Sequence, residues 1–279
     1  MLVLLILVVL KNKKIYADFV KNYKEDITLP GFSPFAFAII DKLKIYKKFP
    51  KIVNFIHQKM IILKGSKLSN DYTKIYLAKV ITLIYLMTLM TLILVELGDE
   101  GYSNLVYGAV IIVIVAVYLV RDLEKKVKER RDAIILEMPE FLNKVILLVN
   151  AGDTIQGAMK KSVLQNRANI QKSPLYFELN EAVAKLDANV SFQEVMKDLS
   201  YRCSIQEVSV FTTTVMMNYR KGGALLVESL KELSVTLWDK RKTLTRVKGE
   251  EASSKLIFPI MLIFVAILLI VAYPAIAIF

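Results

Sequence analysis

The residues that most often perform catalysis or bind metals are scarce in this chain of 279 residues. His57 is the single histidine and Cys203 the single cysteine. Without H-E-x-x-H or a second cysteine, no histidine-based triad or paired-cysteine metal site is predicted in the C-terminal half. The glycine pair Gly222-Gly223 lacks the spacing and the Lys-Ser/Thr of a phosphate-binding loop, and is typical of a helix end. We therefore expect no catalytic, metal-binding or cofactor-binding residue, and predict that the chain is not an enzyme.

Three long apolar runs are the elements that would position any functional residues of the chain. Residues 78–97 and 103–120 are each about long enough to cross a bilayer as a helix. The turn between them, at 98–102, contains two acidic residues and no Lys or Arg. These features predict a membrane hairpin, and a third apolar run at 256–279 predicts a C-terminal membrane helix.

The charges predict how these runs are oriented. Residues 11–77 hold fourteen Lys against five acids, and 121–255 hold twenty-three Lys or Arg against eighteen acids. Since basic segments stay on the cytoplasmic side of membranes, both are predicted to be cytoplasmic and the acidic turn external, in a multi-pass plasma (inner) membrane protein. The net charge of +12 is better explained by lipids or a protein partner than by nucleic acid, because no zinc-finger or RNA-binding signature accompanies it.

The N-terminal part is predicted as two regions. Residues 1–10 are apolar but short, so they form either part of a membrane helix or an interfacial anchor. Residues 11–77 contain three prolines, which favour short helices, and we expect helices over 36–48 and 51–64. These helices either lie in the membrane interface, with lysine stems reaching the headgroups, or form a small subdomain whose aromatic residues are its core.

Residues 121–255 are long enough to bury a core of their own, and apolar residues recur in them at helical spacing. No strand pattern interrupts this spacing. We therefore predict a cytoplasmic, antiparallel bundle of about six helices, the last of which continues toward the C-terminal membrane run. The whole chain is predicted to be an all-α polytopic membrane protein, with regions at 1–10, 11–77, 78–120, 121–255 and 256–279.

Short polar signals mark the ends of the bundle helices. Gly152 is placed to end the first helix, and Ser173 with the proline after it to begin the third. S-x-x-E capping boxes at Ser191 and Ser204 are predicted to begin the fourth and fifth. Trp238, on the sixth helix, is predicted to lie in the core, with a contact to a partner as the alternative.

The residues alone allow two other functional classes. A membrane transporter or channel subunit would need polar residues along its membrane helices, yet only Lys79 and Glu96 are charged in the three runs, both near the ends. A membrane-tethered signalling adaptor would need an external ligand-binding portion, but the external turn has five residues. Both classes therefore rank below an assembly protein.

The order of these features carries a family resemblance. The hairpin and basic segment are followed by M-P-E-F-L at 138–142, the bundle, the glycine pair, and K-L-I-F-P at 255–259. This order resembles the type II secretion system F family, the platform proteins of type II secretion and type IV pilus machines, and most closely its TadC-like members from tight-adherence (Flp) pilus systems. Asn189 stands where the family usually has glycine, but asparagine also tolerates left-handed conformations. The motif positions of structural importance are Pro139, Phe141, Gly152, Gly222, Gly223 and Pro259, and Glu178, Ser191 and Arg202 fall in a mid-domain pattern.

The resemblance implies a non-enzymatic scaffold that couples a cytoplasmic hexameric ATPase to the assembly or export of pilin-like subunits. It further implies contacts with membrane lipids and with copies or paralogues of the chain, because full-length secretion F proteins carry two bundles and this chain shows one. The candidate ATPase-facing residues are Arg130, Arg131, Lys240, Arg241 and Arg246. Each of them could instead serve only to fix the membrane topology.

Overall fold

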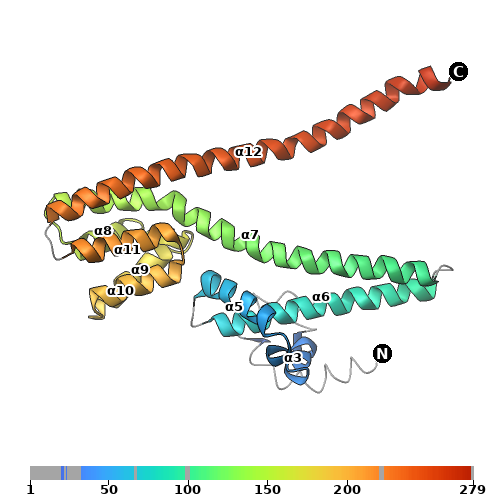
Figure 1. Cartoon of the computed structure of the whole chain (residues 1–279), viewed down its shortest axis with the longest axis horizontal. Coiled ribbons are helices and arrows are strands. Elements are labelled where there is room, and N and C mark those ends of the chain that lie inside the picture. Colours follow the sequence, from blue (N-terminus) through green and yellow to red (C-terminus); the bar gives the residue numbers. More distant parts are fainter. Residues whose placement is uncertain are drawn as a thin grey trace. The chain divides into compact units, whose positions relative to one another are not determined.

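The structure, a computed structural model, describes residues 20–21, 23, 33–65, 68–97, 101–219 and 223–277. Every regular element in these ranges is a helix (Figure 1). Three of the helices are long and apolar enough to cross a membrane, which confirms the prediction of an all-α polytopic membrane protein. The expectations for residues 1–10, Gly222 and positions 98–100 of the turn fall outside the described residues. The chain forms two compact units, 1–130 and 131–279.

Short helices precede a long one in the described part of the first unit. The short helices are α3 (Ser33–Lys42), α4 (Ile45–Lys48) and α5 (Pro50–Lys64), and the long one is α6 (Ser69–Leu97). Phe37 is fully buried in the core that they share, whereas Tyr46 and Phe49 are exposed. The helix predicted over 36–48 is interrupted at Lys44, whose φ of 47° is left-handed. The described helices thus share a core, and their position in the membrane interface stays a prediction.

The membrane hairpin is built from α6 and the first part of α7 (Gly101–Asn150). The Tyr76 hydroxyl of α6 donates a hydrogen bond of 2.6 Å to the carbonyl oxygen of Leu119 on α7. Farther along the pair, a Cβ atom added to Gly108 would lie 2.3 Å from the methyl carbon of Thr91. Such close approach at a small residue is common between membrane helices.

One continuous helix, α7, joins the second apolar run to the bundle. The sequence predicts a membrane segment at 103–120 and a first bundle helix that ends near Gly152. The structure instead shows a single helix of 50 residues, with Pro139 in its interior. Membrane segment and bundle are therefore joined through helical backbone rather than through a loop.

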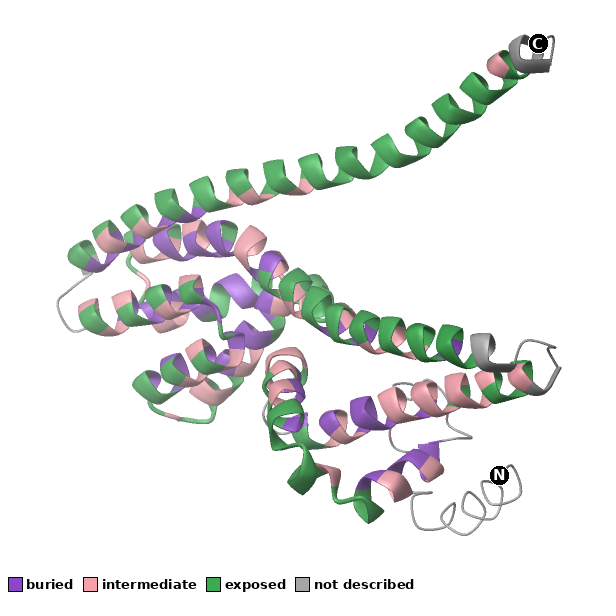
Figure 2. Cartoon of the chain, turned by 45° about the vertical axis from the view of Figure 1, so that its right-hand side comes forward, coloured by how far each residue is buried: buried purple, intermediate pink, exposed green. Residues whose placement is uncertain are grey.

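The bundle in the second unit is formed by the C-terminal part of α7 and five further α-helices. These are α8 (Ile155–Gln165), α9 (Pro174–Asp187), α10 (Phe192–Cys203), α11 (Gln206–Asn218) and α12 (Gly223–Ala277), with a short 3₁₀ turn, η1 (Arg167–Asn169), after α8. Their buried faces meet in one core (Figure 2). Phe141 lies at its centre, with its ring edge-to-face with that of Phe211 at a centroid distance of 5.7 Å.

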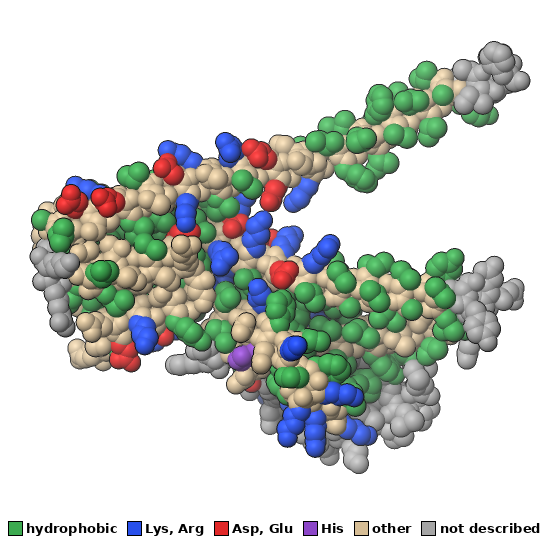
Figure 3. All heavy atoms as spheres, viewed as in Figure 1, with side chains coloured by type: hydrophobic (Ala, Val, Ile, Leu, Met, Phe, Trp, Pro, Cys, Tyr) green, Lys and Arg blue, Asp and Glu red, His purple; other side chains and the backbone are tan. Residues whose placement is uncertain are grey.

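Helix α12 has two parts of different character. Its first part packs in the bundle through buried residues such as Leu226, Leu230 and Leu237. From Leu256 to Tyr273 its apolar side chains are exposed, and the apolar window of this helix has no buried residue (Figures 2 and 3). The prediction that the last bundle helix continues into the C-terminal membrane run is confirmed.

Two helices of the bundle end in the same way. Gly152, with φ 95°, follows α7, and Asn189, with φ 61°, follows α9. In each case the amide of this residue and the amide after it donate 3.0 Å hydrogen bonds to carbonyls of the last turn, as in a Schellman motif. Gly152 therefore ends its helix as predicted, and Asn189 does have the left-handed conformation that glycine would adopt.

The predicted helix starts were partly correct. Ser173 and Ser191 are N-caps, and their hydroxyl oxygens accept hydrogen bonds from the amides of Tyr176 and Glu194. The prediction of a capping box at Ser204 is wrong. Ser204 ends α10 in a left-handed conformation (φ 51°) and its hydroxyl donates to the carbonyl of Tyr201, so α11 begins after Ile205 without a side-chain cap.

Candidate partner-binding surface

The residues with the most reactive side chains make structural contacts. Nδ1 of His57 lies 3.2 Å from Oγ1 of Thr73, and Cys203 is completely buried at the end of α10. In the part of the chain that the structure describes, no group of three or more His, Cys, Asp and Glu residues is arranged to hold a metal ion. The charged surface of the bundle is therefore the main candidate for a functional contact.

The five basic residues singled out from the sequence have different environments. Arg131 is exposed, and Arg130, one position earlier on α7, is half-buried. On α12, Nζ of Lys240 lies 2.7 Å from a carboxylate oxygen of Glu207 on α11. Arg246 pairs along its own helix with Glu250, at 3.5 Å, where both side chains are exposed. The ion pair of Lys240 thus joins two helices, whereas that of Arg246 lies within one helix.

The environment of Glu207 shows that this ion pair stabilises the bundle. Burial raises the pKa of the Glu207 carboxyl group, but hydrogen bonds from Lys240 and from its own amide, with the charges of Lys240 and Arg131, outweigh that effect and lower it. The carboxylate is therefore ionised at neutral pH and holds Lys240 against α11. Lys240 is less available to a partner than its position on α12 implies.

Arg241 instead makes a cation–π contact with Trp238, the single tryptophan of the sequence. Its guanidinium lies 4.9 Å from the ring centroid of Trp238, one turn earlier on α12. Trp238 is 37% exposed, so the prediction that it lies in the core is wrong. Trp and Arg are the residues that most often dominate binding energy at protein interfaces. The exposed Trp238 and the half-buried Arg241 form a pair of this kind, which we call the Trp–Arg pair.

Polar contacts fix the helix that carries this pair against α7. Oγ of Ser234 donates to Oδ1 of Asn143 at 2.6 Å, and Lys248 pairs with the largely buried Asp132 at 3.2 Å. Residue numbers rise along one helix as they fall along the other, so α7 and α12 are antiparallel here. The Trp–Arg pair lies between these two contacts in sequence and is therefore held on a fixed part of α12.

Two residues of the mid-domain family pattern form an ion pair that is largely buried. Nε of Arg202, on α10, donates to a carboxylate oxygen of Glu178, on α9, at 2.6 Å, and the Glu178 side chain is 2% exposed. Burial lowers the pKa of Arg202, but the hydrogen bond and charge of Glu178, with the charges of Asp198 and Glu181, raise it above the ordinary value. These two residues connect helices rather than form a binding site.

The remaining motif positions are structural or lie along α12. Pro139 and Phe141 are buried on α7, and Gly152 ends that helix. Gly223 is the first residue of α12, and Pro259 is exposed in its apolar part.

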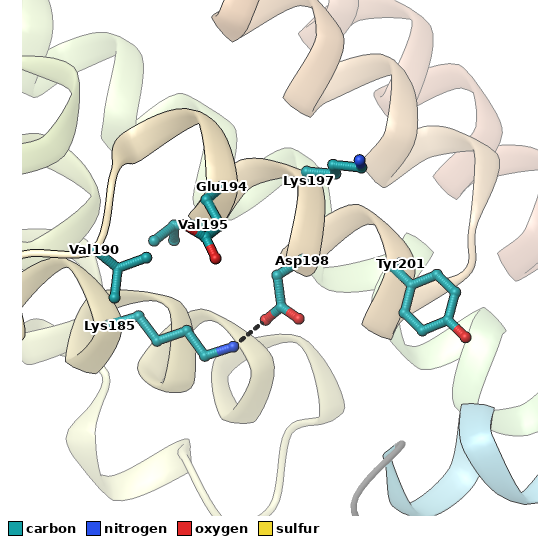
Figure 4. Close-up of a pocket in the computed structure, with 7 residues that line it drawn as sticks. All are labelled: Lys185, Val190, Glu194, Val195, Lys197, Asp198 and Tyr201. Atoms are coloured by element: carbon teal, nitrogen blue, oxygen red, sulfur yellow. Dashed lines mark hydrogen bonds and ion pairs between the residues drawn. The ribbon is translucent and has the colours of Figure 1, made fainter.

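A pocket of about 470 Å³ opens between the end of α9 and α10 (Figure 4). Lys185 and Asp198 point toward each other across it, with 2.5 Å between Nζ and the carboxylate oxygen. Val190 and Val195 supply apolar lining, and Tyr201 is exposed on the other side of Asp198 (Figure 4). Since the two charges neutralise each other, the pocket suits an uncharged or amphipathic side chain of a partner better than an ion.

This pocket was not predicted from the sequence, although one signal for it was present. Glu194, Asp198 and Tyr201 lie at intervals of four and three residues on α10, with Lys197 next to Asp198, opposite the apolar stripe of the helix. That spacing indicates a polar face. It does not indicate that Lys185, from another helix, completes the pocket.

Comparison with known families identifies the domain. Residues 141–274 match the family model described as type II secretion system (T2SS), protein F. The chain therefore carries a domain of this family, and the match runs from the bundle into the apolar part of α12. Members are structural platform proteins that work with secretion ATPases and other components of the machinery. No curated protein and no solved structure matches the chain.

Proposed function

We propose that this chain, with its type II secretion system F domain, is the inner-membrane platform of a type II secretion or type IV pilus machine. As a TadC-like protein of a Flp-type pilus system, it couples a cytoplasmic hexameric ATPase to the assembly or export of pilin-like subunits. It acts as a scaffold without catalysis of its own. The observation that carries the proposal is the family match over the bundle and the apolar part of α12.

The helices support a mechanical role. α7 passes from an apolar run into the bundle core, and α12 passes from the bundle into another apolar run, each as one helix. A force on the bundle is then transmitted along helical backbone, which is stiffer than a loop, to segments within the membrane.

The charge distribution supports the orientation. Lys and Arg side chains are frequent on the bundle and on the helices before α6, while hydrophobic side chains cover the apolar part of α12 (Figure 3). With basic segments retained inside the cell, the bundle faces the cytoplasm, where a hexameric ATPase operates.

The Trp–Arg pair is our candidate for the centre of the ATPase contact. It combines an exposed aromatic ring with one of the five basic residues, and it does not take part in the ion pair that holds Lys240. Arg131 and Arg246, both exposed, add positive charge that would attract an acidic partner surface. A paralogous platform protein would supply the second bundle that full-length family members carry.

Co-purification tests this proposal. The tagged chain is extracted gently from native membranes and its partners are identified by mass spectrometry. We expect a secretion-type ATPase, a sister platform protein or pilin-like subunits. Recovery of a solute-handling protein or a kinase in their place would instead support a transporter or signalling role.

Two variants locate the contact. Trp238→Ala with Arg241→Glu is expected to reduce ATPase recovery at least tenfold, as the loss of an interface centre does. Lys231→Glu is the matched control, because it reverses an exposed charge on the same helix. Equal losses in both would show that general charge, and not the Trp–Arg pair, determines binding.

A further inference from the structure

A second pocket, of about 170 Å³, lies in the first unit between α5, α6 and α7. Each of the three helices contributes one lysine to it, namely Lys64, Lys79 and Lys126. Apolar side chains, among them Met60, Leu63 and Ile75, form the wall. The pocket therefore combines an apolar surface with three ammonium groups.

The pocket lies where the apolar part of the hairpin meets its basic part. The hydrogen bond from Tyr76 to the carbonyl of Leu119 sets these two residues at one level along the helix pair. Lys79 is one turn from Tyr76, and Leu119 precedes Arg121, at which the second apolar run ends. Lysines at this level of a membrane helix lie among lipid headgroups.

The charges around the pocket favour an anion. Lys126 pairs with Asp122 at 2.8 Å, and Nζ of Lys64 lies 4.3 Å from the ring centroid of Tyr72. Lys79 is half-buried and makes no ion pair with a carboxylate among the described residues. Lys79 therefore brings to the pocket a positive charge that no carboxylate of the described residues neutralises.

We propose that this pocket binds the phosphodiester headgroup of an anionic phospholipid. Lys79 and Lys126 contact the phosphate from α6 and α7, and Lys64 closes the site from α5. The glycerol and the first acyl carbons lie against the wall formed by Met60 and Ile75. A bound lipid would thus connect α5 to both helices of the hairpin, whatever machine the chain serves.

The test uses the purified full-length chain in detergent and phosphatidylglycerol with a fluorescent acyl chain, followed by fluorescence polarisation. We expect saturable binding that unlabelled phosphatidylglycerol displaces and phosphatidylcholine does not. Lys79→Gln and Lys126→Gln are each expected to weaken binding about fivefold, the contribution of one lysine near an anionic surface. Lys125→Gln is the matched control, since Lys125 is adjacent to Lys126 but does not line the pocket.

Three results would overturn the proposal. Displacement by inorganic phosphate at the same concentration as phosphatidylglycerol would identify a site for free phosphate. An equal loss in Lys125→Gln would show that binding depends on general charge. Unchanged binding in the Lys79 and Lys126 variants, with helix content preserved by circular dichroism, would place the lipid elsewhere.

Discussion

At the scale of the residue, the family pattern marks contacts that hold the bundle together. Glu178 and Arg202 are 24 positions apart in sequence, yet they form one ion pair between α9 and α10. A buried pair of this kind adds little net stability compared with apolar residues, but the loss of one partner leaves the other charge uncompensated. Their expected role is therefore to fix how α9 and α10 meet.

This role predicts how substitutions combine. Arg202→Ala is expected to destabilise the chain by about 3 kcal/mol, because the buried Glu178 would lose the guanidinium that balances its charge. The double variant Arg202→Met with Glu178→Leu should regain most of that loss. Thermal unfolding in detergent, followed by circular dichroism, measures both. If the double variant is as unstable as the sum of its single substitutions, the two residues act independently and the interpretation is wrong.

At the scale of the element, the ends of the helices depend on left-handed residues. Gly152 and Asn189 occupy equivalent positions after α7 and α9, with φ values of 95° and 61°. For a residue other than glycine or asparagine, this left-handed conformation costs about 1–2 kcal/mol of stability, because the Cβ atom approaches the carbonyl oxygen that follows. The two positions therefore tolerate different sets of residues.

Substitutions at these positions test that argument. Gly152→Ala is expected to destabilise the chain by about 1 kcal/mol although no atom lies within 4 Å of the added Cβ, since the cost is conformational. Asn189→Gly should be neutral or slightly stabilising, and Asn189→Ala destabilising by a similar amount to Gly152→Ala. Thermal unfolding midpoints would rank the three variants. A destabilised Asn189→Gly would mean that the asparagine side chain, and not its backbone, is required.

These helix ends show how far the sequence could predict the fold. Ser173, Ser191 and Gly152 act locally, so residue type and spacing suffice to predict their roles. The same S-x-x-E spacing failed at Ser204 because a serine can also end the preceding helix. Trp238 was misplaced because it directly follows the buried Leu237, and neighbouring positions on a helix face different directions. Pairs such as Lys185 with Asp198 depend on which helices meet, which spacing along one chain does not specify.

The hairpin offers a second test at this scale. Gly108→Val is expected to destabilise the packing of α6 on α7 by about 1–3 kcal/mol, because its side chain would overlap Thr91. Ala109→Val is the matched control, one residue along α7 and exposed. Thermal unfolding in detergent compares the two. Similar midpoints for both variants would mean that Gly108 is not a packing position.

At the scale of the whole molecule, the proposed function requires one orientation. The bundle must face the cytoplasm to meet an ATPase, and the acidic turn at 98–102 must then lie outside. The excess of Lys and Arg flanking the apolar runs, and its absence from the turn, favours this arrangement. The single native cysteine cannot report on it, because Cys203 is completely buried and would be protected on either side of the membrane.

Introduced cysteines can report on the orientation, because the buried native cysteine is not expected to be labelled. With a membrane-impermeant maleimide applied to spheroplasts, Asp99→Cys is expected to be labelled. Lys172→Cys, exposed in the bundle, should be labelled only after the membrane is permeabilised. The wild-type chain, unlabelled in both conditions, is the control. Labelling of Lys172→Cys in sealed spheroplasts would place the bundle outside the cell, where no cytoplasmic ATPase could reach it, and the platform proposal would fail while the family membership of the domain would stand.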